Sequence, residues 1–295
     1  MEIRQLEYFV AVAEAGSFTE AVRRVHVVQS GLSTAVKKLE RELGVSLFDR
    51  SRRRIALTDA GAALLVEARR VLSAVRVAHE SVGHVADGEA GTVRAGIMHS
   101  LVGPRVVDAL ATFHSEHPGV RLAPRTDPGG SGGLVRAVAD DELDLALAGV
   151  AGDPHEGVVT YRLSEERMGL LCPPGDPLAG RDVVALEELH DRSFVDVPPG
   201  WGSRTAFERT LAEHGISRHV DVEVGDVATV TDLVRAGFGL AVLAPSSFER
   251  GADLCLQRLE PAPMFVVSLV LPRQRSLGPA ARLLADALLR TSSVQ

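Results

Sequence analysis

Apolar residues between positions 29 and 43 recur with the period of an α-helix. They step by four, three and four residues, so they share one stripe of the helix, which consists of Leu32, Val36, Leu39 and Leu43. The opposite face is polar and basic and carries Ser30, Ser33, Thr34, Lys37, Lys38 and Arg41. Such a face is typical of a helix that lies in a DNA major groove, although an ordinary solvated helix can show the same pattern.

Two shorter helices are predicted upstream. The first spans residues 3–15, ends at Gly16, and has a buried stripe made of Leu6, Phe9, Val10 and Ala13. The run Ser17-Phe18-Thr19-Glu20 fits a capping box, so a second helix is expected from Phe18 to Val25. A short turn separates it from the basic helix, which we call the recognition helix. The sequence therefore predicts a helix-turn-helix, followed after Gly44 by a wing rich in arginine.

A regular apolar seam runs through residues 59–86. Its members step alternately by four and three residues and are Leu64, Ala68, Val71, Val75, Ala78, Val82 and Val85. This repeat over three heptads predicts a helix that pairs with a second copy, and packing against its own chain is the alternative. A dimer would place two recognition helices about one duplex turn apart, on the order of 34 Å, or a multiple of it, which predicts a dyad-symmetric DNA site.

From Gly91 onward, strands and helices alternate. Strands are predicted at residues 92–98, 120–125 and 143–149, with helices at 101–114 and 134–140. This βαβ order predicts an open sheet with parallel strands. A second α/β unit covers about residues 164–263, with elements at 167–172, 186–189, 193–197, 203–214, 220–224, 227–236 and 240–244. A strand at 264–271 and a helix at 279–290 close the chain.

The charge is distributed unevenly. The chain of 295 residues has a net charge of −7, yet residues 1–87 hold 13 Lys and Arg against 11 Asp and Glu. Residues 23–54 hold nine basic side chains against three acidic ones, which is a plausible footprint for DNA phosphates. Two cysteines, Cys172 and Cys255, cannot form a disulfide framework and are expected to be buried, with a redox pair as a remote option. The N-terminus does not resemble a secretion signal and no membrane span is expected, so we predict a cytoplasmic protein.

The order and spacing of residues 1–61 resemble the winged helix-turn-helix of LysR-type transcriptional regulators. The matching positions are Leu6-Glu7-Tyr8-Phe9, Gly16-Ser17-Phe18-Thr19, Ala21, Gln29-Ser30, Ser33, Val36, Leu39-Glu40, Leu43-Gly44, Leu47-Phe48, Arg50, Leu57-Thr58 and Gly61. The length also fits this family. Two positions depart from it: Val28 stands where a hydroxyl residue often caps the recognition helix, and Ala35 stands where glutamine is common. These departures put the cap in doubt and suggest a different readout of the bases.

The resemblance implies an α+β multi-domain protein that is not an enzyme. We expect an all-α winged helix-turn-helix at residues 1–58, a linker and dimerisation helix at 59–87, and an effector-binding domain at 88–295. That domain is expected to have two α/β lobes like a periplasmic binding protein, with lobe I at about 91–162 and 267–295 and lobe II at about 163–266. The implied partners are double-stranded DNA, further copies of the chain in a homodimer or homotetramer, RNA polymerase and a small-molecule effector of unknown identity, with no other cofactor.

The resemblance also implies positions for the binding residues. Contacts in the DNA groove are expected from Gln29, Ser30, Ser33, Thr34 and Lys37, contacts to the DNA backbone from Arg50, Arg52 and Arg53, and a further DNA contact from Lys38. The effector is expected at Ser100, Leu101, Gly130, Ser131, Trp201, Ser203 and Thr229, where helix N-termini offer amides to an anion such as a carboxylate. His99 or Arg125 could add positive charge. Plain helix capping is the alternative for both Ser100 and Ser131, and a surface or hinge position is the alternative for Trp201.

Three other interpretations of the sequence lead to other classes of protein. Gly129-Gly130-Ser131-Gly132-Gly133 matches the G-x-S-x-G elbow of serine hydrolases and lies between a strand and a helix. However, so glycine-rich a loop meets this pattern easily, and no histidine stands in a recognisable motif. His114 and His117 have a spacing that could hold a metal ion, but they fall at an expected helix end. A solute-binding protein alone would leave residues 1–87 without a role.

Overall fold

The computed structural model describes the whole chain except residues 50–54, 88–90, 100–103, 151–155, 248–253 and 293–295. Its contacts divide the chain into two compact units. The first comprises residues 1–82 with 140–142, and the second comprises residues 83–139 with 143–295. Among the described residues, no helix is both long and apolar enough to cross a membrane.

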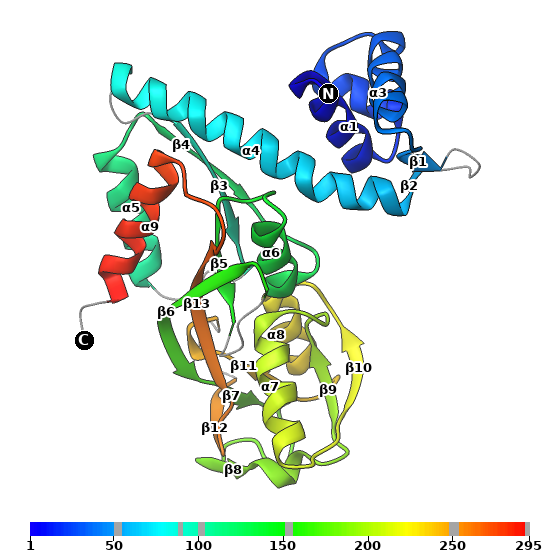
Figure 1. The fold of residues 1–295 in the computed structure, drawn as a ribbon. Coiled ribbons are helices and arrows are strands. Elements are labelled where there is room, and N and C mark those ends of the chain that lie inside the picture. Colours follow the sequence, from blue (N-terminus) through cyan, green and yellow to red (C-terminus); the bar gives the residue numbers. More distant parts are fainter. Residues whose placement is uncertain (50–54, 88–90, 100–103, 151–155, 248–253, 293–295) are drawn as a thin grey trace. The chain divides into compact units, whose positions relative to one another are not determined.

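The first unit contains the predicted helix-turn-helix. Helices α1 (Ile3–Ala15), α2 (Phe18–Val25) and α3 (Gln29–Leu43) have the predicted bounds, and the short strands β1 (Phe48–Asp49) and β2 (Ala56–Leu57) pair antiparallel (Figure 1). Gly16 and Gly44 end α1 and α3 in the left-handed conformation, which glycine adopts without steric strain. The Ser17 side chain accepts the Glu20 N–H at 3.5 Å and so begins α2. These helix ends are local features, which is why the sequence predicted them.

A single apolar core holds the three helices together. Leu32, Val36 and Leu39 of α3 are fully buried, as is Ala21 of α2, whose small side chain lets the two helices approach closely. Leu43, the fourth member of the stripe, is 41% exposed. It is the last residue of α3.

Helix α4 (Asp59–Asp87) carries the predicted seam, and the surroundings of the seam change along the helix. At its start, Ala68 is buried in the core of the first unit and Leu64 packs against that core. Further along, Val71 is 41% exposed and Val82 is 73% exposed, and Ala78 is also exposed. Packing within the chain, the alternative interpretation, therefore applies to the beginning of the seam. Val75 is half-buried, and the side chain of Val85 lies outside the described residues.

The second unit is built on a five-stranded sheet with the order β4-β3-β5-β13-β6. Its strands are β3 (Gly91–Ile97), β4 (Val120–Arg125), β5 (Leu145–Gly149), β6 (Val158–Arg167) and β13 (Met264–Pro272). Strands β3, β4 and β5 run parallel, as predicted, whereas β13 runs antiparallel to both β5 and β6. Helices α5 (Pro104–Glu116) and α9 (Pro279–Ser292) cover one face of this sheet, and α6 (Gly130–Ala139) covers the other (Figure 1).

The alternation of side chains along β5 explains why helices cover both faces of the sheet. Leu145 and Leu147 point into the core shared with α5 and α9, whereas Ala146 and Ala148 point into the core that contains α6. Successive residues of a strand face opposite sides of the sheet, so a strand covered on both faces is apolar throughout. All five residues of β5 are accordingly buried.

A second set of strands completes this unit. A four-stranded sheet has the order β11-β7-β12-β8, and β9 pairs parallel with β10 beside it. The strands are β7 (Gly169–Leu171), β8 (Val183–Ala185), β9 (Ser193–Asp196), β10 (His219–Glu223), β11 (Ala241–Leu243) and β12 (Leu256–Glu260). Helices α7 (Gly202–Glu213) and α8 (Val227–Arg235) and the 3₁₀ turns at Leu186–Leu189 and Pro245–Ser247 pack around them.

Several sequence predictions in this unit need correction. Strands β6, β8 and β12 were not predicted, because none has an alternation strong enough to identify it without its partner. The segment at 186–189 is a 3₁₀ turn. Cys172 is buried as predicted, whereas Cys255 is exposed, and both thiols are free.

Candidate functional site

The recognition helix α3 presents a polar face to solvent. Gln29, Ser30, Thr34, Lys37 and Lys38 are exposed, and Ser33 is half-buried. The buried stripe of Leu32, Val36 and Leu39 faces the core, so this arrangement follows directly from the period of the helix. The three predicted arginines of the wing, Arg50, Arg52 and Arg53, lie outside the described residues.

The two lysines of α3 have different surroundings. The Lys38 ammonium donates a hydrogen bond of 2.7 Å to the Glu2 carboxylate, which lies just before α1. This pair lowers the pKa of Glu2 and raises that of Lys38, because each charge stabilises the other. Lys37 has no such ion pair within the described residues. The positive charge of Lys37 is therefore the less compensated of the two.

The start of α3 lacks the usual side-chain cap. Val28 occupies the N-cap position with φ −80° and ψ 143°, and no side chain accepts the first amides of the helix. Compared with serine, threonine, aspartate or asparagine, an apolar N-cap forgoes about 0.5–2 kcal/mol of stability. The doubt that the sequence raised about this cap is thus confirmed. The Val28 side chain is also 72% exposed.

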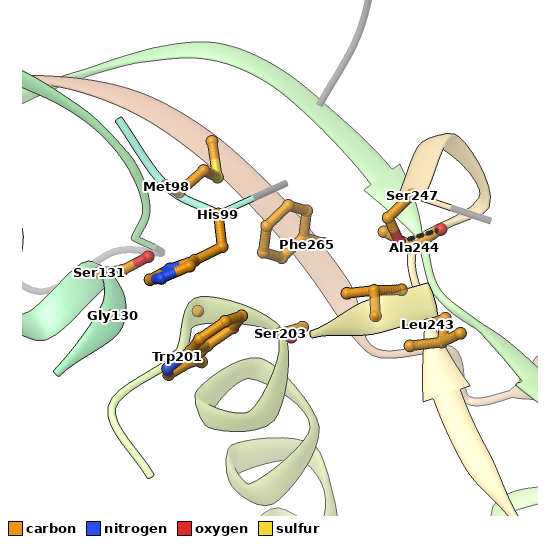
Figure 2. Close-up of a pocket in the computed structure, with 12 residues that line it drawn as sticks. Met98, His99, Gly130, Ser131, Trp201, Ser203, Leu243, Ala244, Ser247 and Phe265 are labelled. Carbon is orange, nitrogen blue, oxygen red and sulfur yellow. Dashed lines mark hydrogen bonds between the residues drawn. The ribbon is translucent and has the colours of Figure 1, made fainter. Parts of the chain in front are cut away.

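A pocket in the second unit collects residues from several distant parts of the chain. Together with the open solvent at its mouth it has a volume of about 460 Å³, and it is lined by Met98, His99, Gly130, Ser131, Trp201, Gly202, Ser203, Val227, Leu243, Ala244, Ser247 and Phe265. Figure 2 shows the His99 and Trp201 rings one above the other, with Ser131 on one side and Phe265 on the other. A second hollow, which is also open to solvent, shares Ser131 and Gly202 with this pocket.

Four of the predicted effector residues line the pocket, namely Gly130, Ser131, Trp201 and Ser203. Thr229 does not line it; this exposed residue bonds to the Asp226 carboxylate, which caps α8. Ser100 and Leu101 lie outside the described residues. Sequence reasoning missed Met98, Leu243, Ser247 and Phe265, because they come from strand ends and a turn that only the fold brings together.

Ser131 connects α6 to β5. Its hydroxyl oxygen accepts the Gly149 N–H at 2.9 Å, and the residue is 4% exposed. Ser131 is therefore not the plain N-cap considered from the sequence, since α6 begins at Gly130 and the serine oxygen serves the end of a neighbouring strand. Among the described residues this hydroxyl donates no hydrogen bond of its own, so its O–H can donate to a molecule in the pocket that Ser131 lines.

Trp201 and His99 form the aromatic wall of the pocket. Their ring centroids are 4.2 Å apart at an interplanar angle of 20°, so the rings are stacked. Trp201 is 7% exposed, and its indole Nε1 has no hydrogen-bond partner in the described structure. A buried donor without an acceptor is unfavourable, so an arrangement that supplied an acceptor would be stabilised.

Glycines bring the two sides of the pocket into backbone contact. The Gly132 N–H donates to the Gly200 carbonyl at 3.1 Å. A Cβ atom at Gly202 would lie 2.3 Å from the Gly149 carbonyl oxygen, and one at Gly130 would lie 2.6 Å from Trp201 Cδ1. The N-termini of α6 and α7 can meet here only because these positions have no side chain.

The geometry does not favour hydrolase chemistry. Ser131 is buried and engaged with Gly149, and within the described residues no histidine bonds to its hydroxyl, as a nucleophile would require. The described residues also contain no group of three or more histidine, cysteine or acidic side chains that could hold a metal ion. The alternative of a serine hydrolase is therefore unsupported.

Comparisons with known proteins identify a family for both parts of the chain. Residues 3–62 match the family model described as a bacterial regulatory helix-turn-helix protein of the lysR family, and residues 86–293 match the LysR substrate binding domain. The transcriptional dual regulator GltC of Bacillus subtilis is 32% identical over 284 residues, which cover 95% of this chain and 94% of that protein.

Solved structures give the same result for the fold. A full-length OxyR variant from Pseudomonas aeruginosa superposes with a TM-score of 0.71 at 25% identity, covering all of this chain and 96% of the other. The full-length CbnR complexed with target DNA has a TM-score of 0.56 at 22% identity and covers 99% of this chain and 100% of the other.

Proposed function

Since the chain belongs to the LysR family of DNA-binding transcriptional regulators, we propose that α3 enters a DNA major groove while the pocket around Trp201 binds the effector. The observation that carries the first part is the polar face of α3, which lies opposite a fully buried apolar stripe. The N-terminal residues of such a helix reach the base edges. Gln29, Ser30, Ser33 and Thr34 are proposed to contact bases, whereas Lys37 is proposed to lie in the groove as well and to reach a phosphate at its edge, and Lys38 to contact a phosphate.

The wing and the linker helix complete the DNA-binding assembly. Arg50, Arg52 and Arg53 are proposed to contact the DNA backbone next to the groove. The exposed part of the seam on α4, which includes Val71, Ala78 and Val82, is proposed to pair with the same face of a second chain. Such a dimer, paired further into a tetramer, would bind a site with dyad symmetry. RNA polymerase is the further protein partner that we propose.

For the domain organisation, we propose a DNA-binding domain at residues 1–58, a linker helix at 59–87 and an effector domain at 88–295. Strands β6 and β13 pair from Val158 to Arg167 and from Met264 to Pro272, and they connect the two sets of strands in the second unit. A change of angle at these strands would alter the pocket between the two lobes. Effector binding would in this way shift populations of the protein between two arrangements.

We propose an effector with a flat apolar body and one anionic group such as a carboxylate. The stacked His99 and Trp201 rings, together with Phe265, suit the apolar body. The anionic group would lie at the N-terminus of α7, where the first amides have no acceptor within the helix and the macrodipole is positive. The hydroxyls of Ser131 and Ser203 would donate to it.

A thermal-shift screen of metabolites tests the pocket. We expect carboxylates with an aromatic or apolar body to raise the melting temperature, and Ser203→Ala to weaken that response. Ser276→Ala, which removes an exposed hydroxyl outside the residues that line the pocket, should respond like the wild type. Stabilisation only by uncharged compounds would contradict the anionic class, and equal responses of both variants would contradict the site.

A further inference from the structure

The N-cap residue of the recognition helix has two features that the folded protein does not use. The Val28 backbone carbonyl accepts the Gly31 and Leu32 N–H groups, but its side chain offers no acceptor to the first amides of α3, and the residue is 72% exposed. Elsewhere in the chain, Ser17 caps α2 and Asp226 caps α8 through side-chain oxygens. A residue that neither caps the helix nor packs in the core is placed where a partner outside the chain can contact it.

The position of the side chain agrees with such a contact. Val28 Cγ2 lies 3.7 Å from the position that a Cβ at Gly31 would occupy, so the valine leans over the first turn of α3. Gly31 is exposed and has no side chain to cover these methyl groups. Val28 and Gly31 therefore form a small apolar surface, which we call the N-cap surface. The exposed residues Gln29 and Ser30 lie directly beside it.

We propose that the N-cap surface contacts the C5-methyl group of a thymine in the major groove, which makes Val28 a residue that determines sequence specificity. This inference rests on the proposed function, because it requires α3 to be the recognition helix. Among the four bases, thymine alone presents a methyl group in the major groove, and apolar side chains recognise it by contact. The N-terminal residues of a recognition helix are those that approach base edges. A contact between two apolar groups needs no hydrogen bond from Val28.

The test begins with the full-length wild-type protein and a library of random DNA duplexes. Duplexes selected for tight binding should contain a thymine at one fixed position in each half-site. That thymine is then replaced by deoxyuridine, which pairs with adenine in the same way but lacks the methyl group. Because the methyl contributes through its buried apolar area, we expect wild-type affinity to fall about threefold to fivefold per half-site.

Variants at Val28 separate the methyl contact from helix stability. Val28→Ser removes both methyl groups but provides a capping hydroxyl, so it should lose the difference between thymine and deoxyuridine while its melting temperature is unchanged or higher. Val28→Thr keeps one methyl group and should retain part of the difference. Val45→Ser is the matched control, because Val45 is a 46% exposed valine beyond the other end of α3. It should discriminate like the wild type.

The outcomes distinguish this inference from the function on which it rests. If wild-type protein selects specific duplexes but Val28→Ser discriminates thymine from deoxyuridine equally well, the inference is overturned and the proposed function stands. The same conclusion follows if the selected duplexes contain no thymine whose methyl affects binding. If the wild type shows no sequence preference at all, the proposed function of α3 fails, and the inference fails with it.

Discussion

Replacing Gly202 by alanine has two opposing effects on stability. It favours the local helix conformation, and it disturbs a close contact between α7 and β5. Gly202 is the first residue of α7 and has no left-handed backbone conformation, so alanine fits the local chain. Alanine is also the better helix former, by roughly 1 kcal/mol at an interior position. Local reasoning alone therefore predicts that Gly202→Ala leaves the stability of the protein unchanged or raises it.

The contacts across the pocket predict the opposite. The new Cβ would lie 2.3 Å from the Gly149 carbonyl oxygen and 2.7 Å from the Gly149 Cα. Both are backbone atoms at the end of β5, and Ser131 holds Gly149 through its amide. No flexible side chain can move aside, so α7 must shift away from β5. Overpacking of this kind costs about 1–3 kcal/mol, which exceeds the gain in helix propensity.

The melting temperature of the effector domain is the first measurement. A loss of 1 kcal/mol corresponds to about 2–4 °C for a unit of this size, so we expect the Gly202→Ala variant to melt several degrees lower. Because Gly202 also lines the pocket, affinity for a compound found in the screen should fall about tenfold for each 1.4 kcal/mol of displaced contact.

Gly225→Ala is the matched control for this prediction. A Cβ at Gly225 would meet only Trp201 Cζ2, at 4.0 Å, and the backbone there is not left-handed. This variant should melt and bind like the wild type. If Gly202→Ala were as stable as Gly225→Ala and bound the compound equally well, the close approach of α7 to β5 would not constrain the pocket, and our reasoning would be refuted.

Three further predictions concern other parts of the molecule. Lys37→Ala should reduce the salt dependence of DNA binding by about one phosphate contact, and Lys38→Ala should reduce it less because Glu2 already pairs with Lys38. Equal salt slopes of the two variants in filter-binding assays would contradict this difference. Val82→Asp places a charge on the exposed part of the α4 seam and should shift sedimentation toward monomer, whereas an unchanged oligomer would exclude this face as the interface. Burial raises the pKa of the Cys172 thiol to about 12. At pH 8 a maleimide should therefore label the exposed Cys255 and leave Cys172 unmodified in the folded protein, which peptide mass spectrometry can measure.

The sequence by itself determined the features that depend on neighbouring residues. A helix makes its hydrogen bonds within four residues, so the period of apolar positions and the glycines at 16 and 44 sufficed to define α1, α2 and α3. The same period identified the polar face of α3. The alternation of strands and helices after Gly91 predicted the parallel core of the second unit, because that order restricts how strands can pair.

Only the tertiary structure decided the features that depend on distant residues. Strands β6, β8 and β12 satisfy their backbone groups through strands far along the chain, so their own patterns were too weak to identify them. The division of the α4 seam between a buried start and an exposed remainder follows from where the core of the first unit ends. In the pocket, the bond between Ser131 and Gly149 and the stacking of His99 on Trp201 join positions 18 and 102 residues apart, and such proximity arises only when the chain has folded.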